Sequence, residues 1–314
     1  MNILITGHRG FVGRHLKDGL SKRYNSGKVF VSDSSRLNLL EPLDHSIINC
    51  ELDYIFHLAA WTKAGDFCLH HPGEQWINNQ KINTNILCYW KEYQPQAKMI
   101  AFGTSCAYPP EKEKTEDNYF NGVADKDLFT YAMTKRMLLA GMQAFAKQYN
   151  MKFLYFIPNT LFGPDFDIED SHFIFDLIKK ICAAKYEGYY GWEETKKVVL
   201  WGSGNQRREL IYVKDAIDLI INSLHLDNEI INIGTGKEKS IKQYARMICD
   251  YVQYNYEDIE FDRSAFEGVK SKYLPPNKIV GSCDKTSLGK AMKETIDYYI
   301  KVKYGKSIQK NRST

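Results

Sequence analysis

The sequence has no Cys-x-x-Cys pair, and its seven cysteines are an odd number. A disulfide framework or a structural zinc site usually shows paired cysteines at short spacings. The cysteine pattern therefore indicates reduced thiols in a cytoplasmic protein, with no bound metal. The seven residues are Cys50, Cys68, Cys88, Cys106, Cys182, Cys249 and Cys283.

A long apolar run is also missing, as are internal repeats and low-complexity linkers. A membrane-spanning helix needs at least ~18 consecutive apolar residues, which no stretch supplies. The first expected strand begins at residue 2, so we expect no signal peptide. The net charge of +4 is small and evenly spread, which argues against a nucleic-acid partner.

The 314 residues alternate between short apolar runs and amphipathic stretches. Strands are expected at 2–6, 28–31, 53–58, 98–103 and 153–157, with helices between them. This alternation predicts an α/β fold with a doubly wound, mostly parallel sheet. The pattern changes after residue 164, and the length allows a second, smaller lobe.

Gly7, Gly10 and Gly13 lie between the first strand and an amphipathic helix. Glycines permit a tight turn there and let a pyrophosphate approach the helix N-terminus, where N–H groups point outward. The spacing predicts a dinucleotide-binding turn. A plain turn between strand and helix is the alternative.

The end of the second strand usually meets the adenosine ribose of a bound dinucleotide. Asp33 would favour a free 2′-hydroxyl and therefore NAD. Arg9 and Arg36 could instead pair with the 2′-phosphate of NADP. The two signals conflict, and either arginine could also be a surface charge.

Small or hydroxyl-bearing residues follow the third and fourth strands. Ala59 and Ala60 would let a cofactor lie against the backbone, or simply serve strand–helix packing, and His57 before them is interpreted as a core histidine. Thr104 follows the fourth strand, where ligands bind in open α/β sheets. Between the third and fourth strands, residues 72–93 are expected to form a helix. Its asparagines would bond to a loop, a cofactor or solvent.

Tyr131 and Lys135 are four residues apart in a run that is expected to be helical, so both lie on one helical face. A phenol has a pKa of ~10, and a nearby ammonium group favours the phenolate. The pair could therefore act as an acid or base for a carbonyl or an alcohol. The same spacing recurs elsewhere in the chain, so the spacing alone does not establish this role.

Two further residues could exchange protons. Cys106 comes two residues after Thr104, although a lone cysteine is by default a small buried hydrophobe. His172 is expected in the first turn of a helix capped by Ser171, where the helix dipole would lower its pKa and leave it a neutral base. An ordinary first-turn histidine is the alternative.

A polar turn with paired arginines, Arg207 and Arg208, follows a short strand that ends at Trp201. Arginines beside a tryptophan can clamp phosphates and stack on a base. A surface turn explains the pattern equally well.

Together these motifs resemble the extended short-chain dehydrogenase/reductase family, within the superfamily of NAD-dependent epimerases and dehydratases. The family markers are Gly7-x-x-Gly10-x-x-Gly13, His57-Leu58-Ala59-Ala60, Thr104 and Tyr131-x-x-x-Lys135, in the family's order. Longer stretches are similar to the GDP-L-fucose synthase branch of this family. They are Gly7-His8-Arg9-Gly10, residues 37–40, residues 103–109, Ser171-His172, and residues 201–204 with Arg208-Glu209.

This resemblance implies an enzyme that epimerises a GDP-4-keto-6-deoxy sugar next to its keto group and then reduces the ketone. The implied cofactor is NADP(H), with NAD(H) as the other possibility. Cys106 and His172 are implied as the acid/base pair of epimerisation. Tyr131 would protonate the oxygen, Lys135 would lower the pKa of Tyr131 and hold the nicotinamide ribose, and Thr104 would hydrogen-bond the sugar oxygen.

The resemblance also implies two sets of binding residues. The cofactor set is Gly7, Arg9, Gly10, Phe11, Val12, Gly13, Ser34, Arg36, Asn38, Leu39, Ala59, Ala60, Gly103, Lys135, Pro158, Asn159, Leu161 and His172. The substrate set is Thr104, Ser105, Cys106, Lys180, Trp201, Arg208 and Asp284, the last from a loosely aligned stretch.

The expected domains are an NADP(H)-binding domain at 1–160 plus about 203–230 and a nucleotide-sugar-binding domain at about 161–202 plus 231–314. A homodimer through helices near 78–93 and 131–147 is expected from the family.

Some residues depart from the branch pattern. Trp61 and Thr62 replace a smaller segment that should touch the sugar, so the sugar could differ from the fucose precursor. Ser105 and Cys106 stand where the dehydratase branch has Asp-Glu, which argues against 4,6-dehydration. A nucleotide-sugar 4-epimerase that retains NAD stays open as an alternative. So does a non-catalytic NADP-sensing regulator, although the retained Tyr131 argues against it.

Overall fold

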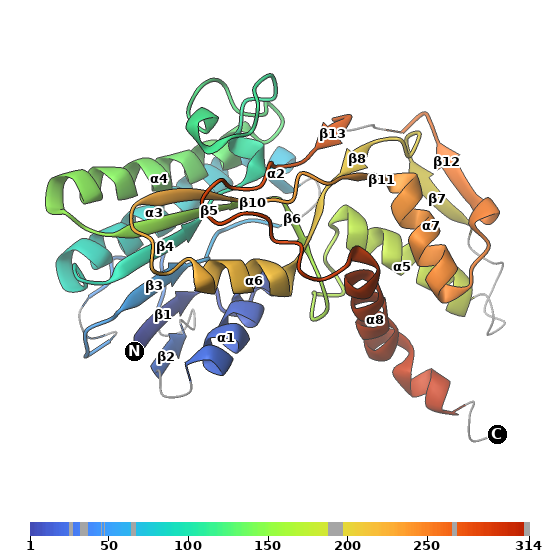
Figure 1. The fold of residues 1–314 in the computed structure, drawn as a ribbon, viewed down its shortest axis with the longest axis horizontal. Coiled ribbons are helices and arrows are strands. Elements are labelled where there is room, and N and C mark those ends of the chain that lie inside the picture. Colours follow the sequence, from blue (N-terminus) through green and yellow to red (C-terminus); the bar gives the residue numbers. More distant parts are fainter. Residues whose placement is uncertain are drawn as a thin grey trace. The chain divides into compact units, whose positions relative to one another are not determined.

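The computed structural model describes residues 1–24, 28–31, 37–44, 46, 48–63, 67–187, 197–265 and 269–310, with side chains up to residue 305. The chain divides into two compact units (Figure 1). Unit 1 consists of 1–159, 213–234 and 274–283, and unit 2 of 160–212, 235–273 and 284–314.

Unit 1 contains a six-stranded sheet with the strand order β10-β5-β4-β3-β1-β2. Every neighbouring pair is parallel, which confirms the predicted doubly wound sheet. Chain order reverses at β1, so the first glycine turn lies where such sheets bind ligands. The strands are β1 (Asn2–Thr6), β2 (Lys28–Val31), β3 (Tyr54–His57), β4 (Lys98–Phe102), β5 (Phe153–Pro158) and β10 (Glu229–Ile233).

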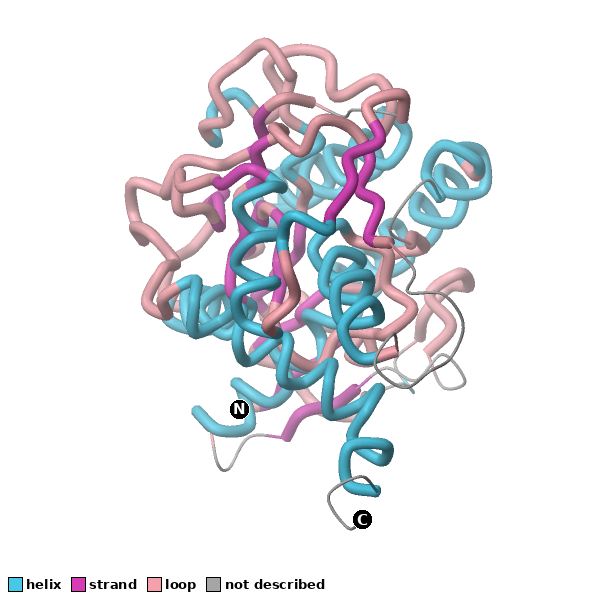
Figure 2. Tube along the Cα trace, turned by 90° about the vertical axis from the view of Figure 1, so that its right-hand side faces the viewer, coloured by secondary structure: helices cyan, strands magenta, loops and turns pink. Residues whose placement is uncertain are grey.

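Helices cover both faces of this sheet (Figures 1 and 2). On one face, α3 (Pro72–Tyr93) packs on α4 (Phe129–Tyr149), and on the other α1 (Phe11–Arg23) packs on α6 (Val213–Asn222). A glycine permits each crossing: a Cβ at Gly141 would lie 2.7 Å from Leu87 Cδ1, and one at Gly19 would lie 2.7 Å from Ile217 Cγ2. Short helices α2 (Phe67–His70), η2 (Ser105–Ala107) and η3 (Glu116–Asn118) follow strand ends.

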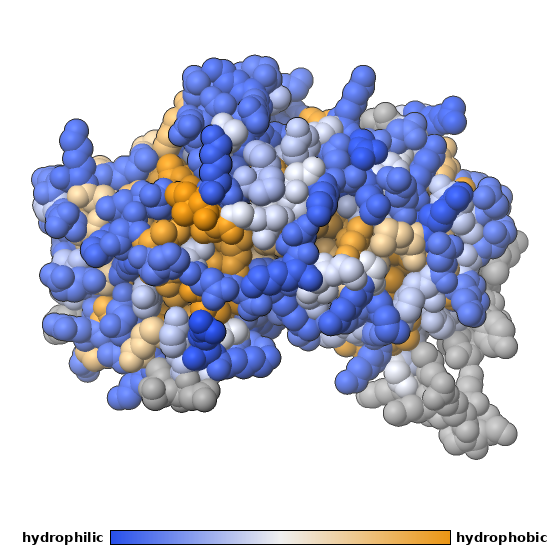
Figure 3. Space-filling view, in the orientation of Figure 1, coloured by the Kyte–Doolittle hydropathy of each residue, from blue (hydrophilic) through white to orange (hydrophobic). Residues whose placement is uncertain are grey.

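The core of unit 1 follows from the apolar strand sequences. Strand β5 has five fully buried residues in succession, as expected for a central strand covered on both faces. Trp90 of α3 is fully buried against this core, and its Nε1 donates to Ala97 O at 2.8 Å. In the space-filling view, apolar side chains gather where β5 and β10 lie in Figure 1 (Figure 3).

One carboxylate joins the three chain stretches of unit 1. Glu116 Oε1 accepts from Asn232 N at 2.8 Å and from Asn277 Nδ2 at 2.6 Å. These residues belong to 1–159, 213–234 and 274–283 respectively. Glu116 therefore links the sheet edge at β10 to the returning segment near residue 277.

Within the described residues, unit 2 is built from small sheets and three helices. The pairs β6 (Thr160–Phe162) with β9 (Leu210–Tyr212) and β7 (Val198–Trp201) with β12 (Ile259–Asp262) are parallel, and β8 (Arg207–Arg208) lies between β11 (Lys239–Ser240) and β13 (Ser271–Lys272). The helices are α5 (Phe173–Tyr186), α7 (Ile241–Val252) and α8 (Leu288–Lys310), and a 3-10 turn, η5 (Tyr256–Asp258), precedes β12.

The two units overlap the predicted domains but differ at three stretches. Residues 203–212 lie in unit 2, because β8 pairs with β11 and β13 there. Residues 231–234 lie in unit 1, because β10 is an edge strand of the large sheet. Residues 274–283 join it, since Gly234 packs so tightly on Leu274 that a Cβ would lie 2.3 Å from its carbonyl oxygen. Which ligand each unit binds stays a prediction.

Candidate active site

The glycine turn of unit 1 leaves space for an anion at the start of α1. Gly7 has φ +71°, and a Cβ there would lie 2.7 Å from Ala59 N. A Cβ at Gly13 would lie 2.3 Å from Gly7 O, so the helix packs directly on the turn. Gly10, in contrast, is exposed and no side chain caps α1. A pyrophosphate therefore fits against the helix N-terminus.

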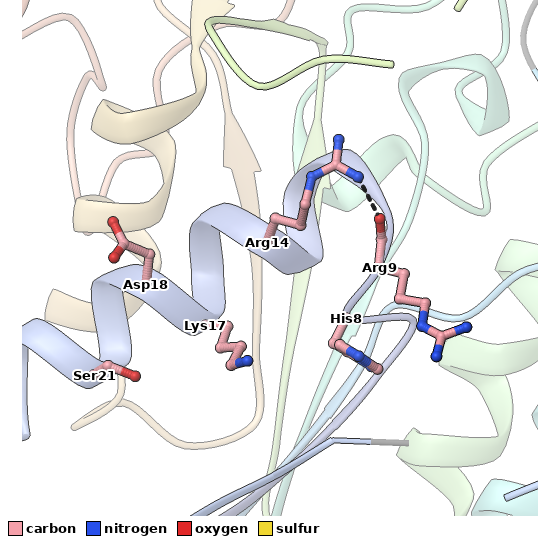
Figure 4. A pocket seen from close by; sticks show the side chains of 6 residues that line it. All are labelled: His8, Arg9, Arg14, Lys17, Asp18 and Ser21. Carbon is pink, nitrogen blue, oxygen red and sulfur yellow. Dashed lines mark hydrogen bonds between the residues drawn. The ribbon is translucent and has the colours of Figure 1, made fainter. Parts of the chain in front are cut away.

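A groove beside this turn carries mostly positive charge (Figure 4). It has a volume of about 650 Å³ and is lined by His8, Arg9, Arg14, Lys17, Asp18 and Ser21. Arg14 reaches back along α1, and its Nη1 donates to Arg9 O at 2.6 Å. The groove therefore favours an anionic ligand.

The structure describes only some of the residues that are expected to bind the ribose. Asp33, Ser34 and Arg36 lie outside the described residues. Asn38 Oδ1 accepts from Leu40 N at 3.2 Å, and Leu39 is buried.

The end of β3 is held by buried hydrogen bonds. His57 Nδ1 lies 2.9 Å from Thr6 Oγ1, which also accepts from Ala59 N at 3.2 Å. His57 Nε2 lies 3.3 Å from Asn83 Oδ1. Burial, and then the charge of Lys135, lower the pKa of His57 to about 3. The interpretation of His57 as a core histidine is confirmed.

Thr104 caps the short helix η2 that carries Cys106. Its Oγ1 accepts from Cys106 N at 3.3 Å, which leaves the hydroxyl proton for another acceptor. Cys106 is partly exposed. Ser105, by contrast, is buried and donates to Asn159 Oδ1 at 3.4 Å, so its hydroxyl points into the protein.

Tyr131 and Lys135 lie one turn apart on α4, with Lys135 Nζ 5.9 Å from the centre of the tyrosine ring. Burial, followed by the charges of Cys106, Cys68 and Tyr119, raises the pKa of Tyr131. Burial lowers the pKa of Lys135 to about 8. Loss of solvent therefore dominates the pKa of Tyr131 and favours the protonated phenol. The expected lowering of this pKa by Lys135 stays a prediction.

Buried side chains fix the segments that carry these groups. Arg136 of α4 donates from Nε to Ala107 O at 3.0 Å, which ties α4 to η2. Tyr155 donates to Lys135 O at 2.8 Å, and the hydroxyl of Tyr119 accepts from Thr104 N at 3.4 Å. Both phenols lie within 3.0 Å of where a Gly103 Cβ would be, so residue 103 has to be glycine beside them.

Asparagines of α3 bond to loops, one of the predicted alternatives, and also to α4, which was not predicted. Asn79 exchanges two hydrogen bonds with the backbone of Trp61, at 2.9 and 3.0 Å. Asn83 Nδ2 donates to Thr134 O at 3.2 Å, and Asn85 Nδ2 donates to Leu39 O at 2.9 Å. Gln75, one turn before Asn79, belongs to the same face but was not predicted. The four-residue spacing of Gln75, Asn79 and Asn83 would have indicated it.

Pro158 and Asn159 end β5 in unit 1. Asn159 is buried, and its backbone N–H donates to Ile233 O at 3.2 Å. Leu161 follows in β6 and belongs to unit 2.

In unit 2, His172 is the N-cap residue of α5, which begins at Phe173. The predicted Ser171 cap and first-turn position are wrong, because the helix starts later. The exposed imidazole pairs with Asp170, whose Oδ1 lies 2.6 Å from His172 Nδ1. Burial alone would raise the pKa of Asp170, but hydrogen bonds from His172 outweigh it and lower that pKa.

The other expected substrate contacts also belong to unit 2. Lys180 on α5 lies 3.1 Å from Asp176, and Trp201 at the end of β7 is exposed. Arg208 is partly buried and donates from Nη1 to Val269 O at 2.8 Å. Asp284 forms an ion pair with Lys237.

Two features are absent from the part of the chain that the structure describes. No group of three or more His, Cys, Asp or Glu side chains there could hold a metal ion. None of the helices in the described ranges is long and apolar enough to cross a membrane.

Comparison with known proteins gives one family and several full-length relatives. The model of the NAD dependent epimerase/dehydratase family matches residues 3–234. The chain is 27% identical over 310 residues to a GDP-L-fucose synthase from Sinorhizobium fredii (strain NBRC 101917 / NGR234), covering 95% of each chain. It is 28% identical over 317 residues to a GDP-L-colitose synthase from Yersinia pseudotuberculosis, covering 96% of this chain and 99% of the other.

A solved structure shares the fold. The structure of a GDP-L-fucose synthetase from Naegleria fowleri bound to NADP matches with a TM-score of 0.78 at 24% identity, covering 96% of this chain and 94% of the other. The residues of the family match contain the large sheet, the glycine turn and the Tyr131–Lys135 pair.

Proposed function

Because the chain belongs to the NAD dependent epimerase/dehydratase family, as its motifs predicted, we propose that it epimerises a GDP-4-keto-6-deoxy sugar next to its keto group and reduces the ketone with NADPH. The full-length relatives named as GDP-L-fucose and GDP-L-colitose synthases support a GDP-sugar epimerase/reductase. The observation that carries the proposal is that Thr104 caps the turn carrying the partly exposed Cys106, and that Arg136 ties this turn to the helix of Tyr131 and Lys135.

The proposed cofactor, NADP(H), supplies the hydride for reduction. Gly7, Gly10 and Gly13 would hold its pyrophosphate against α1, and Arg9 would meet its 2′-phosphate from the groove of Figure 4. Lys135 would hold the nicotinamide ribose. Other proposed contacts are Phe11, Val12, Asn38, Leu39, Ala59, Ala60, Gly103, Pro158, Asn159, Leu161 and His172.

The substitution Arg9→Ala is expected to weaken NADPH binding about tenfold to a hundredfold. This corresponds to the loss of a charge-assisted hydrogen bond, about 1.5–3 kcal/mol. NADH lacks the 2′-phosphate, so its binding affinity should fall less than about threefold. Titration of the purified protein with each nucleotide measures both constants. Arg23→Ala, at the other exposed end of α1, is the matched control. Equal losses for NADPH and NADH would reassign Arg9 to the pyrophosphate or to the surface.

Epimerisation needs one group to remove a proton and another to return it on the opposite face. The keto group acidifies the neighbouring C–H bonds, so a base takes this proton and the electron pair moves onto the oxygen. We assign these proton transfers to Cys106 and His172. The hydroxyls of Thr104 and Tyr131 would donate to the oxygen of the enolate, since Thr104 Oγ1 already accepts from Cys106 N.

The substitution Cys106→Ser is expected to slow deuterium uptake at the carbons beside the keto group by about 10²–10⁴-fold, because a serine hydroxyl is a much poorer base. Binding of NADPH should change little. Mass spectrometry of the sugar nucleotide in heavy water gives the exchange rate. Cys88→Ser, an exposed thiol on α3, is the control. Unchanged uptake in the Cys106 variant would remove this thiol from the mechanism.

The remaining assignments concern the nucleotide and the assembly. Lys180, Trp201, Arg208 and Asp284 are proposed to hold the nucleotide sugar, with Ser105 contributing through its backbone. A cytoplasmic location is proposed from the cysteine pattern. A homodimer is proposed because α3 and α4 expose the apolar side chains Trp76, Ile77, Phe129 and Met137. Sedimentation of the purified protein tests the homodimer.

The test of the proposed function is NADPH consumption with GDP-4-keto-6-deoxymannose, with the product identified by NMR. Oxidation of NADPH with formation of a GDP-6-deoxyhexose supports the proposal. Deuterium uptake without oxidation would reduce the protein to an epimerase. If neither signal appears, the proposed substrate is wrong.

A further inference from the structure

Three buried amide side chains lie on one face of α3, each four residues after the last. Gln75, Asn79 and Asn83 are 0%, 2% and 7% exposed. Asn83 bonds to His57 and to Thr134 O, and Asn79 holds the backbone of Trp61 at both N–H and C=O. Asn83 therefore ties α3 to α4 beside Lys135, and Asn79 fixes the segment at Trp61.

Gln75, the first of the three, is only half satisfied. Its Nε2 donates to Cys68 Sγ at 3.1 Å and to Thr62 Oγ1 at 3.3 Å. Its Oε1 is buried and has no hydrogen-bond partner among the residues that the structure describes. Exchanging the amide oxygen and nitrogen does not remove the problem, because both neighbours lie on the same side of the amide. A buried polar atom without a partner is costly, so a ligand or bound water that reaches this atom would stabilise the protein.

The partners of Gln75 open toward solvent. Thr62 is exposed and Cys68 is partly exposed. The aromatic ring of Phe67 stacks loosely between Trp61 and His71, with ring centres 4.9 and 4.6 Å away. A polar patch beside an aromatic wall suits a ligand with hydroxyl groups and an apolar face, which describes a sugar ring.

This patch lies at the same sheet edge as the proposed reaction centre. Thr62 comes a few residues after the end of β3, and Thr104 follows β4, the parallel neighbour of β3, with His57 opposite Ala101. Burial raises the pKa of Tyr131, and the neighbouring Cys106 and Cys68 add to this rise.

We propose that Thr62, Cys68 and Gln75 form a subsite that binds a ring hydroxyl of the substrate sugar while its keto group lies at Tyr131. A hydroxyl both donates and accepts, so it satisfies the open amide atom in either orientation. The subsite rests on the proposed function and names the part of the protein that recognises the sugar. Thr62 and Cys68 act as ligands of the hydroxyl or as neighbours that hold Gln75 in place.

The substitution Gln75→Met tests this directly, because methionine fills the same space without polar hydrogen-bonding atoms. We expect KM for GDP-4-keto-6-deoxymannose to rise about tenfold or more and KM for NADPH to change less than about threefold. Gln94→Met is the matched control. It removes a buried amide at the other end of α3 that bonds to Leu52 N and Cys50 O, so it should lower the melting temperature without moving KM. Should Gln75→Met fail to fold, the exposed Thr62→Val gives the same readout.

A thiol footprint gives an independent measurement. Cys68 and Cys106 lie in different tryptic peptides, since Lys81 and Lys98 separate them. The protein with NADPH is alkylated with iodoacetamide in the presence of GDP or of GDP-mannose. At a ligand concentration ten times the dissociation constant, GDP-mannose should slow alkylation of Cys68 about tenfold, and GDP alone should not.

The outcomes separate the subsite from the proposed function. Suppose that the protein turns over and that GDP-mannose protects Cys106 but not Cys68. If the sugar KM of Gln75→Met is also unchanged, the subsite is overturned and the proposed function stands. No turnover and no protection of either thiol would overturn the proposed function, and the subsite with it. Protection of Cys68 together with a raised sugar KM supports the assignment.

Discussion

Replacing Tyr131 with phenylalanine is expected to slow ketone reduction by about 10²–10⁴-fold, the usual contribution of a positioned acid. The phenol is protonated at neutral pH because burial raises its pKa, so it is a proton donor for the oxygen that gains charge during hydride addition. Phenylalanine keeps the ring and its packing on α4 but carries no proton. Single-turnover oxidation of NADPH, followed by absorbance, measures the loss.

The same variant should bind NADPH within about threefold of the wild type, a change of less than 1 kcal/mol. Tyr149→Phe, which removes an exposed phenol from the last turn of the same helix, is the control. Wild-type turnover by Tyr131→Phe would remove this residue from the chemistry. A parallel loss of deuterium uptake would show that Tyr131 also stabilises the enolate.

Replacing Lys135 with methionine is expected to abolish reduction while making the ligand-free protein more stable. Lys135 is 7% exposed, and burial lowers the pKa of its ammonium group from 10.5 to about 8. At about 1.4 kcal/mol per pKa unit, keeping this charge buried at pH 7 costs about 3 kcal/mol. Methionine fills a similar volume without the charge, so the variant should gain stability of this order. Urea unfolding at pH 7 measures the difference.

The pH dependence gives this prediction its specific signature. Because the folded pKa is lower than the unfolded one, the unfolded chain binds more protons between about pH 8 and 10.5, and the stability of the wild type rises with pH through that window. The advantage of Lys135→Met should be full below pH 8 and fade toward pH 10.5. A gain that does not vary with pH would point to packing instead. Lys147→Met, in the last turn of α4, controls for removal of a lysine from the same helix.

The sheet of unit 1 was predictable because each strand is a short apolar run between turn residues. The bounds predicted for α3, 72–93, are those observed, since Pro72 suits the first helical turn. Sequence spacing also indicated that Tyr131 and Lys135 share a face. It could not reveal that loss of solvent raises the pKa of Tyr131 and lowers that of Lys135.

Tertiary contacts decided the details that local patterns left open. Ser171 and Asp170 are both common capping residues, and only the structure shows that α5 begins after His172. The hydrogen bond of Gln75 to Cys68 joins α3 to α2 across the single residue His71, and only the structure shows the turn between these helices. The stretch around Leu274 returns to unit 1 through contacts with Gly234, far from it in sequence.

The joining of three chain stretches at Glu116 has a consequence for how the protein is made. When the first 159 residues have emerged from the ribosome, β5 is an edge strand of the sheet with one side unpaired, because β10 is not yet synthesised. All of residues 160–212, which belong to unit 2, must emerge before the edge strand can dock, and Asn277 arrives later still. Unpaired edges invite association with other chains. The nascent protein therefore needs protection at β5 for much of its synthesis, and a chain that stops before residue 229 keeps that edge open permanently.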